Sequence, residues 1–310
     1  MAHVLAIDLG GTKIDIGLIA SDNQIIARSR IPTQQEQGAA AVVERIAQVT
    51  ESLTRDLPRA AKPAALGICT PGPVDHISGS LRTLVNLPAL SGTPLRAMLA
   101  DRLGIPVRLE HDAKAAALGD FHYGAGMDAR SMTYTVVGTG VGAAIIIDGQ
   151  LYYGEGNAAG EIGHITIDRY GAMENSGVRG AVQRYTSGPN LAHRYAEAML
   201  TPNTPEGDPI TGQYVADHAR AGDPVAQRLI AEAGEALGIA IASMAMILDI
   251  ELNVIGGGVA QLGDLLLEPA RVAMRRYSFA ALGERVRIVP SALGDAGALL
   301  GCAFMARTLL

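Results

Sequence analysis

The stretch Leu5-Ala-Ile-Asp8-Leu-Gly10-Gly11-Thr12-Lys13 decides the fold of this chain. An apolar strand ends in an acid and then turns through two glycines. Glycines adopt positive φ and expose backbone N–H groups with no Cβ in the way, so anionic oxygens can approach closely. The stretch predicts a phosphate-binding turn, with Asp8 facing a divalent metal carried by the phosphates. Taken alone, it also fits an ordinary hairpin turn, and that alternative stays open here.

Composition and charge limit what the chain can do. Its 310 residues are enough for two domains, and its formal net charge is -6. Because the chain is acidic and carries no run of Lys or Arg, we expect neither nucleic acid nor a membrane as partner. No window holds the roughly 18 uninterrupted apolar residues of a membrane span. Cys69 and Cys302 lie in apolar segments and no leader precedes the first strand, which favours the cytoplasm.

The first 112 residues are expected to form elements in the order β-β-β-α-β-α-β. Three strands at about 3–8, 14–20 and 24–31 are joined by short turns as an antiparallel meander. A helix at about 42–57 and a strand at 64–69 follow. Thr93 is expected to cap the next helix, with Pro94 at its first position, before a strand at 107–110.

The second half repeats this plan. Strands at about 132–137 and 143–147 flank a glycine turn at 138–142, and a third strand follows residue 149. Helices are expected at 189–200, 213–220 and 224–247, with a surface loop at 201–212. A strand at 252–255 ends at glycines 256–258, and the last helix, at 296–309, follows Gly294-Asp295 as a candidate cap. The duplicated meander and glycine turns predict two lobes that close on a nucleotide.

Five motifs together resemble the ordered motifs of the ROK family of sugar kinases. They are Asp8-Leu-Gly-Gly-Thr-Lys13, Glu110-His-Asp112-Ala-Lys-Ala-Ala-Ala117, Gly138-Thr-Gly-Val-Gly142, Gly160-Glu-Ile-Gly-His164 and Ile255-Gly-Gly-Gly-Val259. The resemblance implies an α/β fold of two actin-like, ribonuclease H-like lobes with a nucleotide and sugar cleft between them. It implies a small lobe of residues 1–112, completed by the C-terminal helix at about 295–310, and a large lobe of residues 113–294.

The resemblance assigns ATP to the glycine turns and Mg²⁺ to Asp8. The groups expected to hold the β- and γ-phosphates are Gly10, Gly11, Thr12, Gly138, Thr139 and Gly140. Lys13 either adds positive charge there or is simply solvated. The adenosine side would be formed by Gly256, Gly257 and Gly258, for which a tight strand-to-helix turn is the alternative.

Asp112 is the candidate general base. It follows a strand and precedes an alanine-rich helix, where the N-terminal amides favour a carboxylate. Phosphoryl transfer has a loose transition state in which the hydroxyl proton leaves late, so orientation can outweigh basicity. By local sequence a plain N-cap is equally good, whereas the resemblance implies the catalytic role.

The resemblance also implies which residues contact the sugar. They are Gly72, Asn86, His111, Asp112, Glu161, His164 and Gln183. Buried polar groups reject substrates that lack a matching hydroxyl, since an unpaired group costs about 1 to 3 kcal/mol. Asn86 has an alternative as a loop residue bonded to its own backbone, and His164 as a histidine satisfied in place.

Two positions depart from the family pattern near the sugar. His111 stands where the family usually has Asn, and Gln183 stands where it has an acid. An imidazole is larger than an amide and can protonate, and a glutamine donates as well as accepts. We therefore hypothesise a substrate other than plain glucose, with a tolerated replacement of His111 as the alternative.

The family's zinc site is another departure. Its three thiolates are replaced here by Glu174, Ser176 and Ala181, which leaves His164 as the only remaining ligand. We predict that the protein binds no zinc.

These observations predict an ATP- and Mg²⁺-dependent kinase that phosphorylates a hydroxyl, the primary one, of a hexose or hexose derivative. A kinase for an amino sugar, an N-acetyl sugar or a cyclitol is the alternative. A sugar-responsive repressor of the same family would need a helix-turn-helix, for which there is no room before Asp8. A structural or chaperone ATPase of the superfold would not need Glu161 and His164. The resemblance implies a homodimer.

Overall fold

Two five-stranded sheets with the same strand order form the framework of the chain. The structure is a computed structural model that describes residues 2–174 and 176–310. Its sheets have the orders β3-β2-β1-β4-β7 and β10-β9-β8-β11-β12. In each sheet a three-stranded antiparallel meander adjoins two parallel strands. The duplication predicted from the sequence is confirmed.

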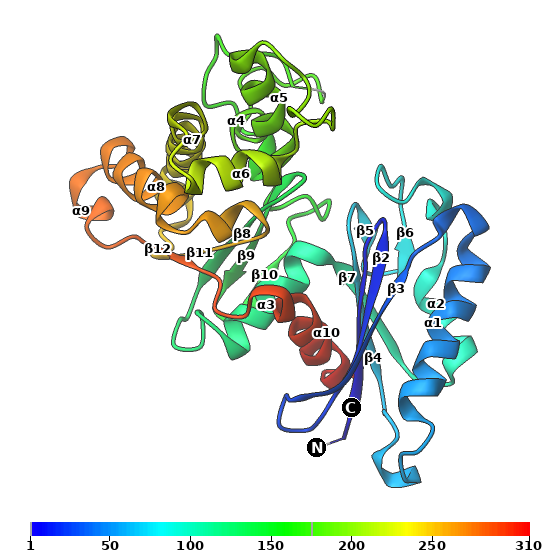
Figure 1. Cartoon of the computed structure of the whole chain (residues 1–310). Helices are drawn as coiled ribbons and strands as arrows, with labels where there is room; N and C mark the ends of the chain where they lie inside the picture. Colours follow the sequence, from blue (N-terminus) through cyan, green and yellow to red (C-terminus); the bar gives the residue numbers. More distant parts are fainter. Residues whose placement is uncertain (1, 175) are drawn as a thin grey trace. The chain divides into compact units, whose positions relative to one another are not determined.

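The first compact unit holds residues Met1–Met127, Tyr153–Asn157 and Ala292–Leu310. Its sheet strands are β1 (Val4–Leu9), β2 (Lys13–Ile19), β3 (Ile25–Pro32), β4 (Leu66–Thr70) and β7 (Val107–His111). Helices α1 (Ala39–Thr54) and α2 (Leu95–Leu103) lie on one face, and α3 (Asp112–Tyr123) and α10 (Gly297–Arg307) on the other (Figure 1). A small hairpin of β5 (Val74–Asp75) and β6 (Ser80–Leu81) completes it.

The apolar strands explain the core of this unit. Strands β1 and β4 run through the middle of the sheet with helices on both faces, and nearly every side chain in them is buried. Strand β3, at the edge, alternates partly buried and exposed residues. This is the period of two expected for a sheet edge with one dry face.

The second compact unit holds residues Asp128–Tyr152 and Ala158–Ser291. Its strands are β8 (Met132–Val137), β9 (Val141–Ile147), β10 (Gln150–Tyr152), β11 (Leu252–Gly256) and β12 (Arg287–Pro290). Its helices are α4 (Val182–Thr186), α5 (Gly188–Met199), α6 (Gly212–Arg220), α7 (Pro224–Leu248), α8 (Asp264–Tyr277) and α9 (Ala280–Gly283). By length and composition α7 could cross a membrane, but 61% of that window is buried inside the structure, as expected for a core helix.

Both predicted helix caps are wrong. Pro94 occupies the cap position of α2, with no side-chain cap bond, and Thr93 instead closes the preceding turn through its backbone. Helix α10 begins at Gly297, two residues later than Asp295, which lies in the 3-10 turn η6 (Gly294–Ala296). Its carboxylate is 3.5 Å from Arg30 rather than on the helix amides.

Some elements were missed or placed differently. The hairpin β5–β6, the edge strand β12 and the short helices α4 and α9 were not predicted.

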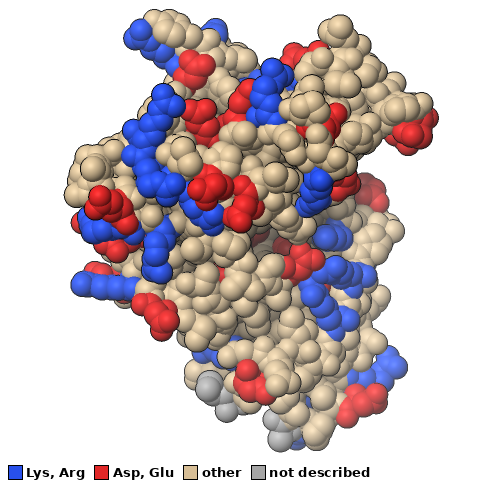
Figure 2. Space-filling view, turned by 60° about the vertical axis from the view of Figure 1, so that its left-hand side comes forward, with Lys and Arg blue, Asp and Glu red and all other residues tan. Residues whose placement is uncertain are grey.

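Because α3 packs on α10, the first unit extends to Met127, beyond the predicted boundary at residue 112. On the face drawn in Figure 2, Lys and Arg side chains lie near Asp and Glu side chains, and uncharged residues cover much of the surface between them.

Candidate active site

The first glycine turn, Gly10–Thr12, joins β1 to β2 and is fixed from several sides. The Thr33 hydroxyl donates to Gly10 O at 2.7 Å, and Thr33 N donates to Thr12 O at 3.0 Å. A Cβ on Gly11 would lie 2.9 Å from Asn86 O, so only glycine allows this approach. The N–H groups of Gly11 and Thr12 have no partner among the described residues, which leaves them to meet an anion.

Asp8 ends β1 beside this turn. The thiol of Cys69 donates to Asp8 Oδ1 across 3.6 Å. Burial, and to a smaller extent the negative charge of Asp112, raise the pKa of Asp8 to about 6. An oxygen ligand at a strand end beside free amides fits a hard cation such as Mg²⁺, whose binding would favour the ionised carboxylate.

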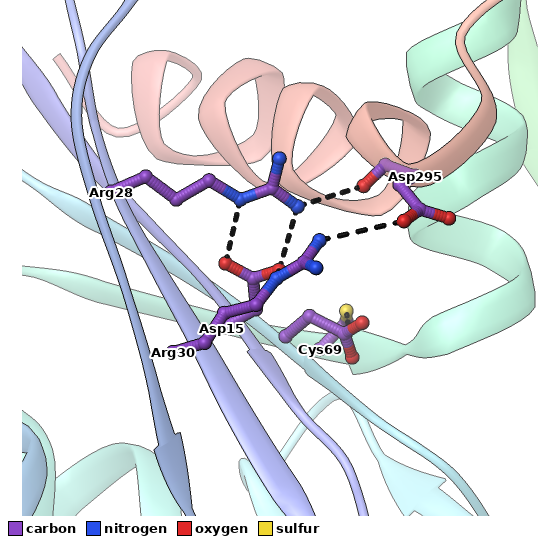
Figure 3. A network of polar contacts seen from close by, with 6 residues as sticks. Asp15, Arg28, Arg30, Cys69 and Asp295 are labelled. Carbon is purple, nitrogen blue, oxygen red and sulfur yellow. Dashed lines mark hydrogen bonds and ion pairs between the residues drawn. The ribbon is translucent and has the colours of Figure 1, made fainter.

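A second acid in the same sheet has a different environment. Asp15 lies opposite Asp8 in the β1–β2 register. It receives hydrogen bonds of 2.9 and 2.6 Å from Arg28 and one of 2.7 Å from Arg30, while Asp295 lies across from both arginines (Figure 3). Burial alone would raise the pKa of Asp15, but the two guanidinium groups lower it. Asp15 is a compensated structural charge, whereas Asp8 is the candidate metal ligand.

Asp112 is the first residue of α3, at the end of β7. The cap position belongs to His111, whose Nδ1 accepts from Ala113 N at 3.3 Å. Asp112 Oδ1 accepts from the same N–H at 2.6 Å, and its side chain is 37% exposed. Asp112 is therefore not the N-cap. Its carboxylate is held at the positive end of a helix and remains reachable from solvent.

Glu110, the residue before His111 and Asp112, belongs to a buried hydrogen-bond network that the sequence did not predict. The Glu110 side chain is 1% exposed and accepts hydrogen bonds from His111 N at 2.8 Å and from the Tyr153 hydroxyl at 2.9 Å. Burial raises the pKa of Tyr153 to about 12. The buried Lys114 ammonium lies 4.7 Å from the Tyr153 ring centroid and donates to Asn157. A lysine within an alanine run was the available signal for this contact.

The second glycine turn, Gly138–Gly140, joins β8 to β9 in the same way. Gly138 N donates to Gly140 O at 2.9 Å, and Gly138 O accepts from Gly188 N at 2.8 Å. The side chain of Gln183 reaches the same turn, because its Oε1 accepts from Val141 N at 3.0 Å.

A cavity of about 760 Å³ opens beside this turn within the second unit. Predicted nucleotide residues Gly138, Thr139 and Gly258 line it. It is closed by residues that the sequence did not single out, among them Pro189 in α5 and Thr211 at the end of the predicted surface loop. The volume and the largely apolar lining suit a nucleoside.

Two further predicted glycines, Gly256 and Gly257, precede the cavity residue Gly258 and pack closely on β8. A Cβ on Gly257, whose φ is 91°, would lie 2.4 Å from Val137 O, and one on Gly256 would lie 2.0 Å from the Tyr134 hydroxyl. Glycine at both positions lets the end of β11 lie against β8, where the second phosphate turn begins.

The model of the ROK family matches residues 4–309. The chain belongs to the ROK family. A glucokinase of Streptomyces coelicolor is 31% identical, over 99% of this chain and 98% of its own length. The ROK hexokinase of Thermus thermophilus superposes with a TM-score of 0.83 at 31% identity, covering 99% of this chain and 98% of that one. A ROK glucokinase of Streptomyces griseus, solved with glucose and AMPPNP, superposes with a TM-score of 0.81 at 29% identity over 99% and 100%.

These matches confirm the predicted actin-like, two-lobed α/β fold. The sugar residues expected from the ROK pattern in the first unit lie near its turns. Gly72, with φ 89°, lies two residues after the end of β4, and a Cβ there would meet Leu84 at 2.7 Å. The Asn86 side chain is exposed, and its backbone adjoins Gly11.

The ROK Glu-x-x-His unit is fixed on β9 in the second unit. A Cβ on Gly160 would lie 2.0 Å from Ala143 O, so the segment packs directly on the strand backbone. Glu161 is exposed, and His164 Nε2 is 3.9 Å from its carboxylate. His164 Nδ1 is buried with no hydrogen-bond partner among the described residues, and contact of His164 with the sugar stays a prediction.

The segment that carries zinc in the ROK pattern is held by hydrogen bonds here. Glu174 accepts from Ser176 N at 2.7 Å and from Gln183 Nε2 at 3.1 Å. Residues 2–174 and 176–310 contain no group of three or more His, Cys, Asp or Glu side chains able to hold a metal ion. The absence of zinc stays a prediction.

Proposed function

We propose that the protein transfers the γ-phosphoryl group of ATP to a hydroxyl, the primary one, of a hexose or hexose derivative. The observation that carries the proposal is the Asp112 carboxylate, held at the N-terminus of α3 by Ala113 N and still 37% exposed. The glucokinase relatives, one of them solved with glucose and an ATP analogue, support a sugar acceptor and ATP as donor.

In the reaction the sugar hydroxyl oxygen attacks the γ-phosphorus, the bond to the β-phosphate oxygen breaks and ADP leaves. Asp112 orients the hydroxyl and accepts its proton. The free amides of Gly11 and Thr12, and those of Thr139 and Gly140, bind phosphate oxygens as charge develops. Asp8 would hold the Mg²⁺ ion, which when bound would neutralise part of that charge.

The sugar is set by the groups beside Asp112 and by the Glu-x-x-His unit. His111 Nδ1 lies 3.2 Å from Asp112 Oδ1, so a protonated imidazole would pair with the base. We propose a substrate other than plain glucose, such as an amino sugar, an N-acetyl sugar or a cyclitol. A panel of hexoses and these derivatives tests this, and a kcat/KM for glucose tenfold above all others overturns it.

The setting of the reaction is a separate proposal that rests on the ROK motifs and the acidic composition of the chain. We propose a Mg²⁺-dependent homodimer that works in the cytoplasm, with neither nucleic acid nor a membrane as partner. The formal net charge of -6 agrees with this choice of partners.

The substitution Asp112→Asn tests the kinase assignment. It keeps the shape of the side chain but removes the proton acceptor, so we expect kcat to fall by at least 1,000-fold, with AMPPNP binding unchanged within threefold. Asp101→Asn, at an exposed position of α2, is the matched control and should retain full activity. A D112N enzyme within tenfold of wild type, or a wild type inert toward the whole sugar panel, contradicts the proposal.

A further inference from the structure

We infer that Gln183 and Glu174 form a brace that positions the second phosphate turn, Gly138–Gly140, so that Gln183 serves the nucleotide rather than the sugar. The inference rests on the proposed function for the identity of the nucleotide. It changes the role expected of Gln183 from the sequence, and it adds Glu174 as a positioning residue.

The brace is a chain of hydrogen bonds within the second unit. Gln183, in the first turn of α4, accepts from Val141 N at 3.0 Å and donates from Nε2 to Glu174 Oε1 at 3.1 Å. Glu174 is only 7% exposed, and its other oxygen accepts from Ser176 N at 2.7 Å. Both polar atoms of the Gln183 amide are thereby engaged inside the protein.

Of glutamine and glutamate at position 183, only glutamine makes both of these bonds without binding a proton. Val141 N–H requires an acceptor, and the Glu174 carboxylate, bonded already to an N–H, favours a donor. A glutamate at position 183 would satisfy Val141 but would direct its second oxygen at Glu174. The buried carboxylate of Glu174 and the partly buried one at position 183 would then repel each other, or one would have to bind a proton.

The brace acts on the turn at its exit. The turn is anchored at its entrance by Gly188 N, which donates to Gly138 O at 2.8 Å, and at its exit by Gln183. A Cβ on Gly140 would lie 3.2 Å from Gln183 Oε1, so the amide also packs against the turn. Between the two anchors, the N–H groups of Thr139 and Gly140 have no partner among the described residues.

The isosteric substitution Gln183→Glu tests the brace. We expect KM for ATP to rise at least tenfold at pH 8, and the Kd for AMPPNP to rise in parallel, while KM for the sugar stays within twofold. The AMPPNP defect relative to wild type should shrink at pH 6, where the added carboxyl can bind a proton. A role of Gln183 in general folding alone would not move the nucleotide constants selectively.

A swapped pair provides the rescue. In the double variant Glu174→Gln with Gln183→Glu, a glutamine at 174 can donate to a glutamate at 183, which still accepts Val141 N, and the net charge is that of wild type. We expect the AMPPNP Kd to return to within threefold of wild type. Gln48→Glu is the matched control, because Gln48 donates to Glu44 at 3.3 Å on the exposed face of α1, and it should bind AMPPNP like wild type.

The outcomes separate the possible roles. A Q183E enzyme whose sugar KM rises tenfold with an unchanged AMPPNP Kd would identify Gln183 as a sugar contact and overturn the brace. A double variant no better than Q183E, at equal melting temperature, would overturn the pairing with Glu174. Because AMPPNP binding is measured without sugar, a wild type that phosphorylates nothing refutes the proposed function and still leaves the brace tested.

Discussion

Two paired acids of the first sheet, Asp8 and Asp15, show how neighbouring side chains decide whether a carboxyl group is ionised. Asp8 and Asp15 face each other across β1 and β2. Two arginines hold Asp15 as an anion, whereas Asp8 has a thiol at 3.6 Å and no hydrogen bond from a cationic side chain among the described residues. Asp8 is therefore costly to ionise in the free protein, and a bound cation would offset that cost.

The raised pKa of Asp8 predicts the acid limb of the pH profile. Because the ionised form serves the metal and the pKa is about 6, kcat/KM for MgATP should fall about tenfold per pH unit below pH 6. Saturating Mg²⁺ should shift this limb to lower pH, since the cation favours the carboxylate. An acid limb that does not move with Mg²⁺ concentration contradicts the assignment of Asp8.

The same shift has a consequence for stability. The pKa of Asp8 rises from 3.8 to about 6 on folding, so the group stabilises the fold below pH 3.8 and loses that contribution as pH rises through 6. At pH 7.5 without metal, Asp8→Asn should therefore raise the free energy of unfolding by roughly 2 to 3 kcal/mol while activity is lost. Denaturant melts at pH 7.5 and pH 4 measure this, and the gain should vanish at pH 4.

At the scale of elements, close packing of α10 depends on glycines. A Cβ on Gly301 would lie 1.7 Å from Ala115 O in α3, and one on Gly67 would lie 1.9 Å from Cys302 O in α10. In both cases the obstacle is backbone, so a side chain could be accommodated only by moving α10 away from α3 or from β4.

Two substitutions in α10 separate this packing from helix propensity. Gly301→Ala should lower the free energy of unfolding by about 3 kcal/mol or more, because the helices must separate. Gly297→Ala is the control, since its nearest contact would be an ordinary 3.7 Å from Leu293, and it should be neutral or stabilise by up to about 1 kcal/mol. Chemical denaturation of both variants gives the comparison, and equal losses would contradict it.

The strength of the local signal decided which elements the sequence predicted. Long periodic segments such as α7 and the buried strands β1 and β4 were predicted within a few residues. The two cap predictions were wrong because Thr93 makes backbone hydrogen bonds in the preceding turn and Asp295 forms an ion pair with Arg30. No local sequence pattern reveals these contacts. The edge strand β12 was missed because it is a four-residue segment, half of it exposed, that pairs with β11 alone among the described strands.

The site was predictable only in part, for the same reason. Glycine turns and Asp112 carry local signals, whereas the Glu110–Tyr153 bond and the Gln183–Val141 bond join segments about 40 residues apart. The cavity wall near Thr211 comes from a stretch that the sequence marked only as a surface loop. Loops of that kind gain a function only once the fold places them beside a turn.

At the scale of the whole molecule, one topology is used twice with different results. Both sheets carry a glycine turn after their first strand, but the 760 Å³ cavity beside Gly138 lies in the second unit, walled by α5 and α6. A pocket of 220 Å³ in the first unit lies instead by Thr50 and Arg102, at helices α1 and α2. The cavity therefore supports the proposal that the nucleoside binds to the second unit.

Hydrogen exchange tests that assignment across the entire chain. AMPPNP added without sugar should slow exchange at least fivefold in peptides covering 186–216 and 256–262, because the bound nucleoside would fill the cavity and restrain local opening of its walls. Glucose added alone should leave these peptides unchanged. Peptides of α1 and α2 serve as internal controls and should exchange alike in all three samples. Slowing confined to α1 and α2 would move the nucleoside to the first unit and refute the cavity as its site.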